Sequence, residues 1–325
     1  MTVYGSRSND LIYMNLQAAG HAGFDTIYAV GGFVYTSASA LGDDVFGGNS
    51  FTTIHGETGT GTQYLFLGSG GGTVFGGAGN DLISGGISTV TLHAGSGNQT
   101  IDSGFGANDQ IFAGAGTDTI YVESANATVT NSSGNDTISF SASGGTVRLG
   151  FGGTTIYGGT GTGGLTVINP NGPTGNATIF AGNGTGNNIT GGSGSGTNIL
   201  FGGTSADVVH GGDFAGTNDI FGYLGNDILY GGVQAFDEFL NPQLINNYFN
   251  LTYDIHAGDA DDIANWRNSA TYHDWIFLPA AVQGATNFYP TGTDVVGYVA
   301  IGTGYYGMYI NNASLADVTA HVFYS

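Results

Sequence analysis

Aliphatic side chains recur at a regular interval along the chain, separated by short runs of glycine and small polar residues. Many of them lie at multiples of about nine residues from one another. The regularly placed residues are Ile83, Ile101, Ile111, Ile120, Ile138, Ile156, Ile189, Ile199 and Val209. One apolar residue between two outward-facing neighbours is the alternation of a half-buried β-strand. The pattern therefore predicts three-residue strands, for example at 82–84, 100–102, 119–121 and 137–139, joined by six-residue turns.

The interval comes from a repeated nonapeptide. GGAGNDLIS at residues 76–84 fits the pattern G-G-x-G-x-D-x-U-x completely, where U is a large apolar residue. Looser copies are GGTSADVVH at 202–210, GYLGNDILY at 222–230 and SGNDTI at 133–138, and others centre on Asp10, Asp25, Asp44, Asp109, Asp118 and Asp219. The sixth position of successive copies falls at Asp81, Gln99, Asp118, Asp136 and Thr154, in steps of 18 or 19 residues. Two nonapeptides therefore make one coil, and stacked coils bury a core that no single coil could bury.

Glycine-rich and threonine-rich sequence is also typical of flexible linkers. A linker has no reason to place a β-branched residue at regular multiples of nine. We therefore expect an ordered all-β solenoid rather than a low-complexity segment.

The charge of the chain favours cations and disfavours nucleic acid. The sequence has 24 acidic residues against three arginines and no lysine, and its formal net charge is −21. Such a surface repels phosphate backbones and anionic membranes and concentrates divalent cations. Of the 24 acids, 21 are aspartate, the acid that suits tight turns and short-reach calcium ligation.

Export signals and disulfides are not visible in the usual places. The chain has no cysteine, which excludes disulfides and thiolate metal sites. The first residues, MTVYG, lack the basic and apolar regions of a secretory signal peptide. No stretch reaches the roughly 18 apolar residues of a membrane helix. An export signal, if the protein leaves the cell, is expected at the other end of the chain.

The nonapeptide resembles the repeat of the RTX family of exported bacterial proteins, and the resemblance covers nearly the whole chain. It implies a parallel β-roll in which turn glycine carbonyls and the aspartates of position six, from neighbouring coils, coordinate calcium. This chemistry agrees with elementary expectation, because Ca²⁺ takes six to eight oxygen ligands and a glycine turn exposes its carbonyls. We expect an all-β, right-handed parallel β-roll or β-solenoid with a β-rich C-terminal cap.

A complete calcium site requires aspartate in two turns about 18 residues apart, which ranks the candidates. The strongest pair is Asp118 with Asp136, whose turns contain Gly116 and Gly134. The other expected metal ligands are Asp25 with Asp44, Asp207 with Asp227 and its turn residue Gly225, and Asp81 with Gly77 and Gly79. Asp81 faces only Gln99 in the next coil, so that site is half-built or empty. For three isolated acids a metal-free Asx-turn is as good an interpretation as a ligand; these are Asp10, Asp109 and Asp219.

The aspartates give way to threonine and asparagine in two stretches, at about residues 50–75 and 145–200. GGTTI at 152–156, GTGNNI at 184–189 and GTNI at 196–199 keep the glycines and a core isoleucine but lack the carboxylate. We expect these coils to be held by backbone, threonine and asparagine hydrogen bonds, without bound metal.

The composition changes after Gly232, where glycine becomes rarer and aromatic residues accumulate. We expect 1–235 to be the solenoid and 236–325 a cap that protects its end strands. DDIANW at 261–266 and DWIFL at 274–278 resemble the segment that closes RTX rolls. Residues 311–325 resemble the family's C-terminal export signal, which ends in a short apolar group, here 322–324. The resemblance implies type I secretion to the cell exterior, although these residues can equally form a last β-strand packed on the cap.

The sequence contains no recognisable catalytic motif. It has neither an H-E-x-x-H zinc-protease helix nor a G-x-S-x-G nucleophile elbow, and its seven histidines show no ligand spacing. We therefore expect a secreted, non-enzymatic, calcium-binding structural protein that self-assembles into an extracellular S-layer, matrix or fibre. The expected partners are further copies of the chain, cell-surface or extracellular polysaccharide and, during export, the type I secretion machinery.

Two other functions remain open. The first is an adhesin or ice-binding solenoid that uses threonine ladders such as those at 159–163 and 184–186. The second is a calcium-dependent extracellular enzyme with a C-terminal sugar groove lined by Trp266, Tyr272, His273 and Trp275. Aromatic residues in such a position are more often cap core.

Overall fold

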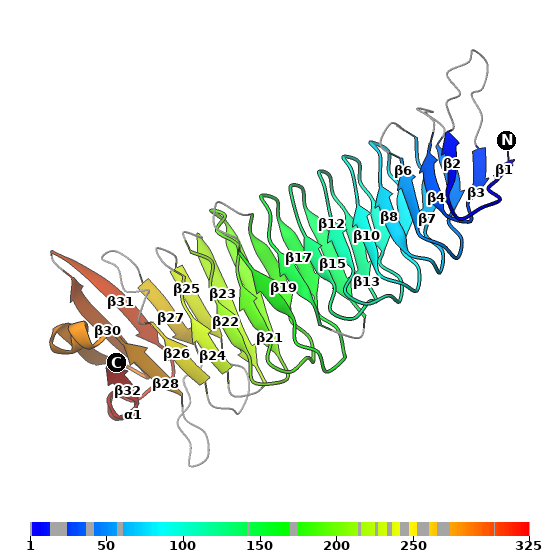
Figure 1. Cartoon of the computed structure of the whole chain (residues 1–325). Coiled ribbons are helices and arrows are strands. Elements are labelled where there is room, and N and C mark those ends of the chain that lie inside the picture. The colour runs from blue at the N-terminus through cyan, green and yellow to red at the C-terminus, as the bar shows by residue number, and fades with distance from the viewer. Residues whose placement is uncertain are drawn as a thin grey trace. The chain divides into compact units, whose positions relative to one another are not determined.

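Short strands joined by glycine-rich turns make up most of the chain in a computed structural model (Figure 1). The structure describes residues 2–13, 25–36, 42–56, 61–141, 144–169, 175–213, 216–224, 227–232, 236–240, 247–251, 260–264, 274–301 and 303–324. The chain divides into two compact units, Met1–Gly161 and Thr162–Ser325, called here the N-terminal and C-terminal units.

In the N-terminal unit, the chain alternates between two parallel sheets. The odd-numbered strands are β1 (Thr2–Tyr4), β3 (Asp25–Tyr28), β5 (Asp43–Phe46), β7 (Tyr64–Phe66), β9 (Leu82–Ser84), β11 (Thr100–Asp102), β13 (Thr119–Val122), β15 (Asp136–Phe140) and β17 (Thr154–Tyr157). The even-numbered strands are β2 (Asp10–Tyr13), β4 (Gly32–Tyr35), β6 (Thr52–His55), β8 (Gly72–Phe75), β10 (Val90–His93), β12 (Gln110–Phe112), β14 (Thr128–Thr130) and β16 (Thr146–Arg148). Strands pair in parallel within their own set, as β9 does with β11 and β10 with β12. One coil therefore contains two strands, as the nonapeptide spacing predicted.

The predicted column of isoleucines lies in register along the odd-numbered strands. Ile83 pairs with Ile101, Ile101 with Ile120, and the column continues through Ile138 and Ile156. All these side chains are fully buried. The even-numbered strands contribute a second buried column of Val74, Leu92, Ile111, Val129 and Val147. Because burying one such side chain stabilises a fold by about 1.5–3 kcal/mol, these two columns form the core of the unit.

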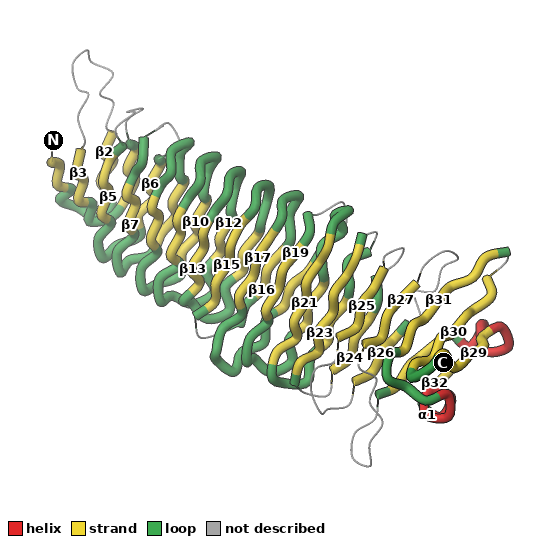
Figure 2. The backbone as a smooth tube through the Cα atoms, turned by 180° about the vertical axis from the view of Figure 1, so that it is seen from behind, coloured by secondary structure: helices red, strands yellow, loops and turns green. Residues whose placement is uncertain are grey.

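The turns stack so closely that some of them require glycine. Gly134 has a backbone φ of 120°, and an added Cβ would lie 1.4 Å from the carbonyl oxygen of Gly116 in the preceding coil. Gly152 lies over Gly134 in the same way, with 1.5 Å between its added Cβ and the Gly134 carbonyl oxygen. Successive turns are therefore in backbone contact, and strands and turns alternate regularly along the unit (Figure 2).

The C-terminal unit winds in the same two-sheet manner. Its even-numbered strands are β18 (Thr166–Ile168), β20 (Asn188–Thr190), β22 (Val208–His210), β24 (Asp227–Tyr230), β26 (Asn247–Asn250) and β28 (Trp275–Leu278). Its odd-numbered strands are β19 (Ala177–Phe180), β21 (Thr197–Gly203), β23 (Thr217–Tyr223), β25 (Phe236–Leu240) and β27 (Ala260–Ala264). Parallel pairing extends to β27 and β28, beyond the change in composition after Gly232.

The cap follows these coils and covers the last strand of both sheets. It consists of η1 (Ala280–Ala285), β29 (Thr286–Thr291), β30 (Asp294–Ile301), β31 (Gly304–Ile310), α1 (Leu315–Ala320) and β32 (Val322–Tyr324). β29, β30 and β31 are antiparallel, whereas β31 pairs in parallel with β27 and β32 with β28 (Figure 1). Residues 322–324 thus form a last strand, and their role in export stays a prediction. Among the described residues, no helix has the length and apolar character needed to span a membrane.

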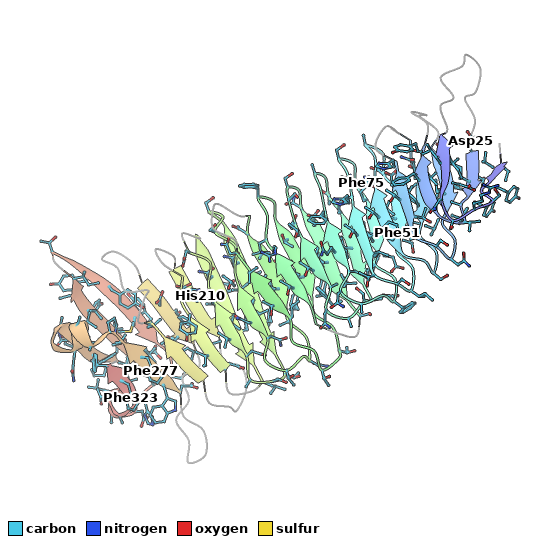
Figure 3. The ribbon with its side chains drawn as sticks, viewed as in Figure 1. Asp25, Phe51, Phe75, His210, Phe277 and Phe323 are labelled. Carbon is cyan, nitrogen blue, oxygen red and sulfur yellow. The ribbon has the colours of Figure 1, made fainter. Side chains whose placement is uncertain are left out.

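Aromatic side chains fill part of the last coils and of their contact with the cap. Phe239 and Phe249 are fully buried, with ring centroids 5.5 Å apart in an edge-to-face arrangement. Phe277 and Phe323 stack at 5.7 Å, joining β28 to β32 (Figure 3). Other aromatic residues of the expected cap lie outside the described residues, namely Tyr253, Trp266 and Tyr272.

One predicted core residue is wrong. Ile199 is only half-buried, and the fully buried position in β21 belongs to Leu200, which pairs with Ile179 and Ile220. Two aliphatic residues follow Asn198 in sequence, and the strand register places the second of them inside. Asn198 itself is fully buried at the corner of the coil.

Candidate metal sites at the corners of the coils

A ladder of polar side chains follows one corner of the N-terminal unit, where the turns enter the odd-numbered strands. The members of this N-terminal ladder are buried and are Asp25, Asp43, Gln63, Asp81, Gln99, Asp118, Asp136 and Thr154. Backbone N–H groups of Gln63, Asp81, Gln99 and Asp118 donate to a side-chain oxygen of the next member, at 2.9, 2.7, 2.7 and 2.8 Å. Each of these side chains therefore joins its own coil to the backbone of the preceding one.

Asp118 and Asp136, the strongest predicted pair, occupy neighbouring positions in this ladder. Each is only 1% exposed. Oδ1 of each accepts a backbone hydrogen bond, whereas Oδ2 of each has no hydrogen-bond partner within the described part of the chain. Burial raises the pKa of Asp118 to about 6. Burial, reinforced by the negative charge of Asp118, raises the pKa of Asp136 to about 7. Burial therefore disfavours the charged form of both carboxyl groups at this step of the ladder, meaning the contact between two successive members, and a proton or a cation bound there would offset that cost.

The pair Asp207 and Asp227 has the same geometry on the even-numbered strands of the C-terminal unit. With Asn187 these residues form the Asp207 ladder, in which the backbone N–H of Asn187 donates to Asp207 and that of Asp207 to Asp227, both at 2.9 Å. Oδ2 of both aspartates is buried without a partner among the described residues. Burial raises the pKa of Asp207 to about 7, and burial together with the charge of Asp207 raises that of Asp227 to about 8.

The expected pair of Asp25 with Asp44 requires a correction. Asp25 pairs in register with Asp43, and Asp44 pairs with Thr26. Asp43 is the fully buried member of the ladder, whereas Asp44 lies one position further along the strand and is half-buried. Burial, together with the charge of Asp43, raises the pKa of Asp44. Asp43 and Asp44 are adjacent in the sequence, and the expected interval of 19 residues from Asp25 selected Asp44. The coil is one residue shorter, so Asp43 takes the ladder position.

Asp81 lies at a step that contains an amide in place of a second carboxylate. Both of its oxygens accept hydrogen bonds, Oδ1 from the backbone of Gln63 at 2.9 Å and Oδ2 from that of Gly77 at 2.8 Å. Burial raises its pKa. The Gln99 side chain donates through Nε2 to the carbonyl of Gly79 at 2.8 Å and to that of Gly77 at 3.5 Å. The glycine carbonyls predicted to bind metal at this step therefore already accept from an amide.

A third ladder, which the sequence did not suggest, lies on the odd-numbered strands of the C-terminal unit. This Asn218 ladder consists of Asn198, Asn218, Asp237 and Asp261, all fully buried. Asn198 Nδ2 donates to Asn218 Oδ1 at 2.7 Å, and Asn218 Nδ2 donates to Asp237 Oδ1 at 2.6 Å. The ladder ends where the hydroxyl of Tyr306 donates to Asp261. The signal in the sequence was an asparagine six residues after Gly192 and again after Gly212.

The isolated acids behave differently from one another. Asp10 accepts from the backbone N–H groups of Ser6 and Arg7, which is the arrangement of a turn cap. Asp109 is fully buried, accepts from the backbone of Val90 at 2.8 Å, and has its pKa raised by burial. Asp219 was expected at a turn position, but Asn218 occupies that position, and Asp219 is half-buried on the strand with a pKa raised by burial.

The carboxylate oxygens at the Asp118–Asp136 and Asp207–Asp227 steps are ligands that suit calcium. Each step has two carboxylates with a buried oxygen that accepts no hydrogen bond from the described residues. At the first step, Gly116 and Gly134 lie in stacked turns; Gly225 of the second lies outside the described residues. The described residues contain no group of three or more Asp, Glu or His side chains placed to hold a metal. Backbone carbonyls and water would therefore have to supply most of the six to eight ligands.

His55 and His93 lie in a stack of rings on the outer side of the even-numbered strands of the N-terminal unit. Neighbouring ring centroids in this stack are 4.4, 5.0, 4.7 and 4.6 Å apart, and the rings belong to Tyr35, His55, Phe75, His93 and Phe112. Burial lowers the pKa of His93 and favours its neutral form. In the C-terminal unit, His210 stacks on Tyr230 at 5.3 Å (Figure 3). Such cross-strand stacking stabilises a sheet.

The residues considered for a sugar groove are only partly described. Trp275 packs against His321 and Phe323, at ring distances of 4.9 and 5.1 Å. Trp266, Tyr272 and His273 lie outside the described residues.

Comparison with known proteins adds no family. No protein-family model matches the sequence, and none of the curated proteins does. The resemblance to the RTX repeat rests on the nonapeptide itself, and parallel coils agree with it without identifying it.

Proposed function

We propose that this chain is a secreted, RTX-type, calcium-binding structural protein that self-assembles outside the cell. The observation that supports it best is the pairing of buried carboxylates in stacked coils, Asp118 with Asp136 and Asp207 with Asp227. An unpaired buried carboxylate pair destabilises a fold unless a proton or a cation neutralises it. Extracellular calcium would supply that cation and join one coil to the next.

The surface of the N-terminal unit supports association with further copies. Three turns that precede even-numbered strands expose large apolar side chains: Phe51 is 59%, Ile87 67% and Phe105 72% exposed. The strand surfaces add exposed tyrosines, and the chain has no lysine to discourage contacts between strand edges. The high negative charge opposes such contacts, so divalent cations would also promote assembly by lowering repulsion between copies.

Electron microscopy of the purified full-length chain tests this proposal. We expect ordered sheets or filaments in calcium chloride that dissolve on addition of a chelator. Magnesium chloride at the same concentration is the matched control, because it screens charge equally but demands a tighter octahedral site. Monomers in all three conditions would contradict the proposal.

A second candidate function is binding to a regular lattice, either ice or crystalline polysaccharide. Four threonines lie in register on the outer side of consecutive odd-numbered strands: Thr100, Thr119, Thr137 and Thr155. Adjacent strands are spaced by about 4.8 Å, so the hydroxyls form an evenly spaced row. Thermal hysteresis or pull-down with insoluble glycan would support this candidate. If the activity is lost when Thr119 and Thr137 are changed to Lys, the threonine row is the binding surface.

A further inference from the structure

The amide of Gln99 occupies a place in the N-terminal ladder where oxygen atoms converge. Its Nε2 donates to the carbonyls of Gly79 and Gly77, and its Oε1 accepts from the backbone of Asp81. Both oxygens of Asp81 accept backbone hydrogen bonds, Oδ1 from Gln63 and Oδ2 from Gly77, so the Gln99 amide has only the glycine carbonyls to satisfy. Between Asp118 and Asp136, two contacts further along the ladder, no described side chain donates to the corresponding oxygens, and Oδ2 of each carboxylate accepts no hydrogen bond from the described residues.

Asparagines of the C-terminal unit make the same kind of contact. Asn187 Nδ2 donates to the carbonyls of Gly184 and Gly202, at 3.2 and 3.1 Å. Asn198 Nδ2 donates to the Gly192 carbonyl, and Asn218 Nδ2 to the Gly212 carbonyl, at 2.7 and 3.2 Å. The amides of Asn198 and Asn218 also donate to a side-chain oxygen of the next coil, which for Asn218 is the carboxylate of Asp237.

The groups that accept from these amides are the groups that calcium binds. Glycine carbonyls, side-chain amide oxygens and carboxylates are all ligands of Ca²⁺. An amide NH₂ supplies two hydrogen-bond donors and no net charge, so it satisfies the same oxygens without a metal. An amide at this position is also neutral, so it adds no buried charge in the absence of a cation.

We propose that the interior amides of Gln99, Asn187, Asn198 and Asn218 take the place of a cation, so that calcium binding is confined to the all-carboxylate steps. This inference rests on the proposed calcium function and specifies which steps use it. In the N-terminal ladder Gln99 makes the step to Asp81 independent of metal, whereas the step from Asp118 to Asp136 depends on it.

In the C-terminal unit the two kinds of step belong to the same coils. β22 and β23 are consecutive strands. Asp207 directly precedes β22, and Asn218 is the second residue of β23. One corner of such a coil is held by amide hydrogen bonds, and the other requires a cation. Removal of calcium is therefore expected to loosen the Asp207 corner while the Asn218 corner stays paired.

Calcium titration of the full-length chain tests the inference. Gln99→Asp converts the amide step into a carboxylate step, and calorimetric titration at pH 8 should show at least one more bound calcium than the unmodified chain. Asn98→Asp is the matched control. It adds the same charge one residue away, on an exposed side chain whose Oδ1 accepts from Thr117 and can still do so. Its calcium stoichiometry should equal that of the unmodified chain.

Thermal melts in chelator provide a second readout that needs no metal. Gln99→Asp should melt at least about 5 °C lower in chelator than the unmodified chain, because it loses two amide hydrogen bonds and gains a buried charge. The double variant Asp118→Asn with Asp136→Asn should melt higher than the unmodified chain in chelator at pH 8, and should bind one calcium fewer. This second variant keeps the test decisive if Gln99→Asp does not fold.

The outcomes separate the inference from the proposed function. If the unmodified chain binds calcium but Gln99→Asp gains no site, or the double variant is less stable in chelator, the amide inference is wrong and the calcium function stands. If the unmodified chain binds no calcium, the proposed function fails. The melts of the double variant then still decide whether an amide satisfies these corners better than a carboxylate does.

Discussion

Gly134 illustrates at the level of one residue why glycine recurs in the turns. A Cβ atom there would overlap the carbonyl oxygen of Gly116, and the backbone φ of 120° disfavours any other residue. We expect Gly134→Ala to lower the free energy of unfolding by at least about 3 kcal/mol, since overlap and backbone strain add. Urea denaturation followed by circular dichroism in calcium measures the change.

Gly284 is the control for that substitution. An added Cβ at Gly284 meets no atom within 4 Å. Gly284→Ala should therefore change the free energy of unfolding by no more than about 0.5 kcal/mol, or slightly increase it by restricting the unfolded chain. If the two substitutions changed the free energy of unfolding equally, the close stacking of the turns would not be the reason why glycine is required at position 134.

The sequence predicted the core residues well where only one aliphatic residue was available. Ile101, Ile120 and Ile138 have no aliphatic residue directly beside them, and all three lie in the predicted column. Where two similar residues are adjacent, the spacing chose correctly at Ile83 beside Leu82 but wrongly at Ile199 and at Asp44. The reason is variable coil length, because the ladder steps range from 18 residues at Asp81 to 24 at Asp261.

At the level of strands and turns, the repeat pattern identified the corners but not how each corner is satisfied. The nonapeptide places a polar residue at the entry to a strand, and both carboxylates and amides fit that position. Whether its partner is a backbone N–H, a glycine carbonyl or a second side chain depends on the coil above or below. The Asn218 ladder was missed because Asn198 was interpreted only as a replacement for aspartate, and Asp219 was chosen in place of the adjacent Asn218.

The last strand gives a prediction at the same level. β32 pairs in parallel with β28 and covers that edge of the even-numbered sheet, and Phe323 stacks on Phe277. We expect removal of residues 322–325 to expose the edge of β28 and to cause aggregation, because unpaired strand edges bind other chains. Light scattering during refolding in calcium measures this effect, independently of any role of these residues in export.

A substituted variant separates backbone pairing from apolar packing in that strand. Changing residues 322–324 to three threonines keeps a chain that favours β structure but removes the rings. This variant should aggregate less than the truncated one and melt below the unmodified chain. If truncation leaves the protein as soluble and as stable as before, β32 does not protect the sheet edge, and the export interpretation of these residues gains weight.

At the scale of the whole molecule, negative charge makes the stability of the fold depend on pH and on cations. The chain has 24 acids and only three arginines, so folding concentrates negative charge with few internal counter-ions. A carboxyl group changes stability with pH only where its pKa differs between the folded and the unfolded chain. The buried ladder carboxyls differ, since burial raises the pKa of Asp118 to about 6, of Asp136 and Asp207 to about 7, and of Asp227 to about 8.

The sign of the resulting pH dependence follows from these raised values. Between pH 4 and 8 the folded chain holds protons that the unfolded chain has released, so in chelator the free energy of unfolding should fall as the pH rises across this whole range. A single carboxyl whose pKa differs by about two units between the two states accounts for roughly 2.6 kcal/mol, and four such groups should produce a loss of at least about 2 kcal/mol between pH 5 and pH 8. Urea midpoints at pH 5, 6.5 and 8 measure this loss.

Added calcium is the control for this pH dependence of stability, and histidine titration is the effect that opposes it. Saturating calcium should remove most of the loss, because the cation replaces the protons at pH 8. Protonation of His93, whose pKa burial lowers, acts in the opposite direction and favours unfolding at acid pH. A chelated chain that grows more stable from pH 5 to pH 8 would therefore mean that histidine titration outweighs the ladders, and that the paired aspartates are solvated in solution rather than enclosed between coils.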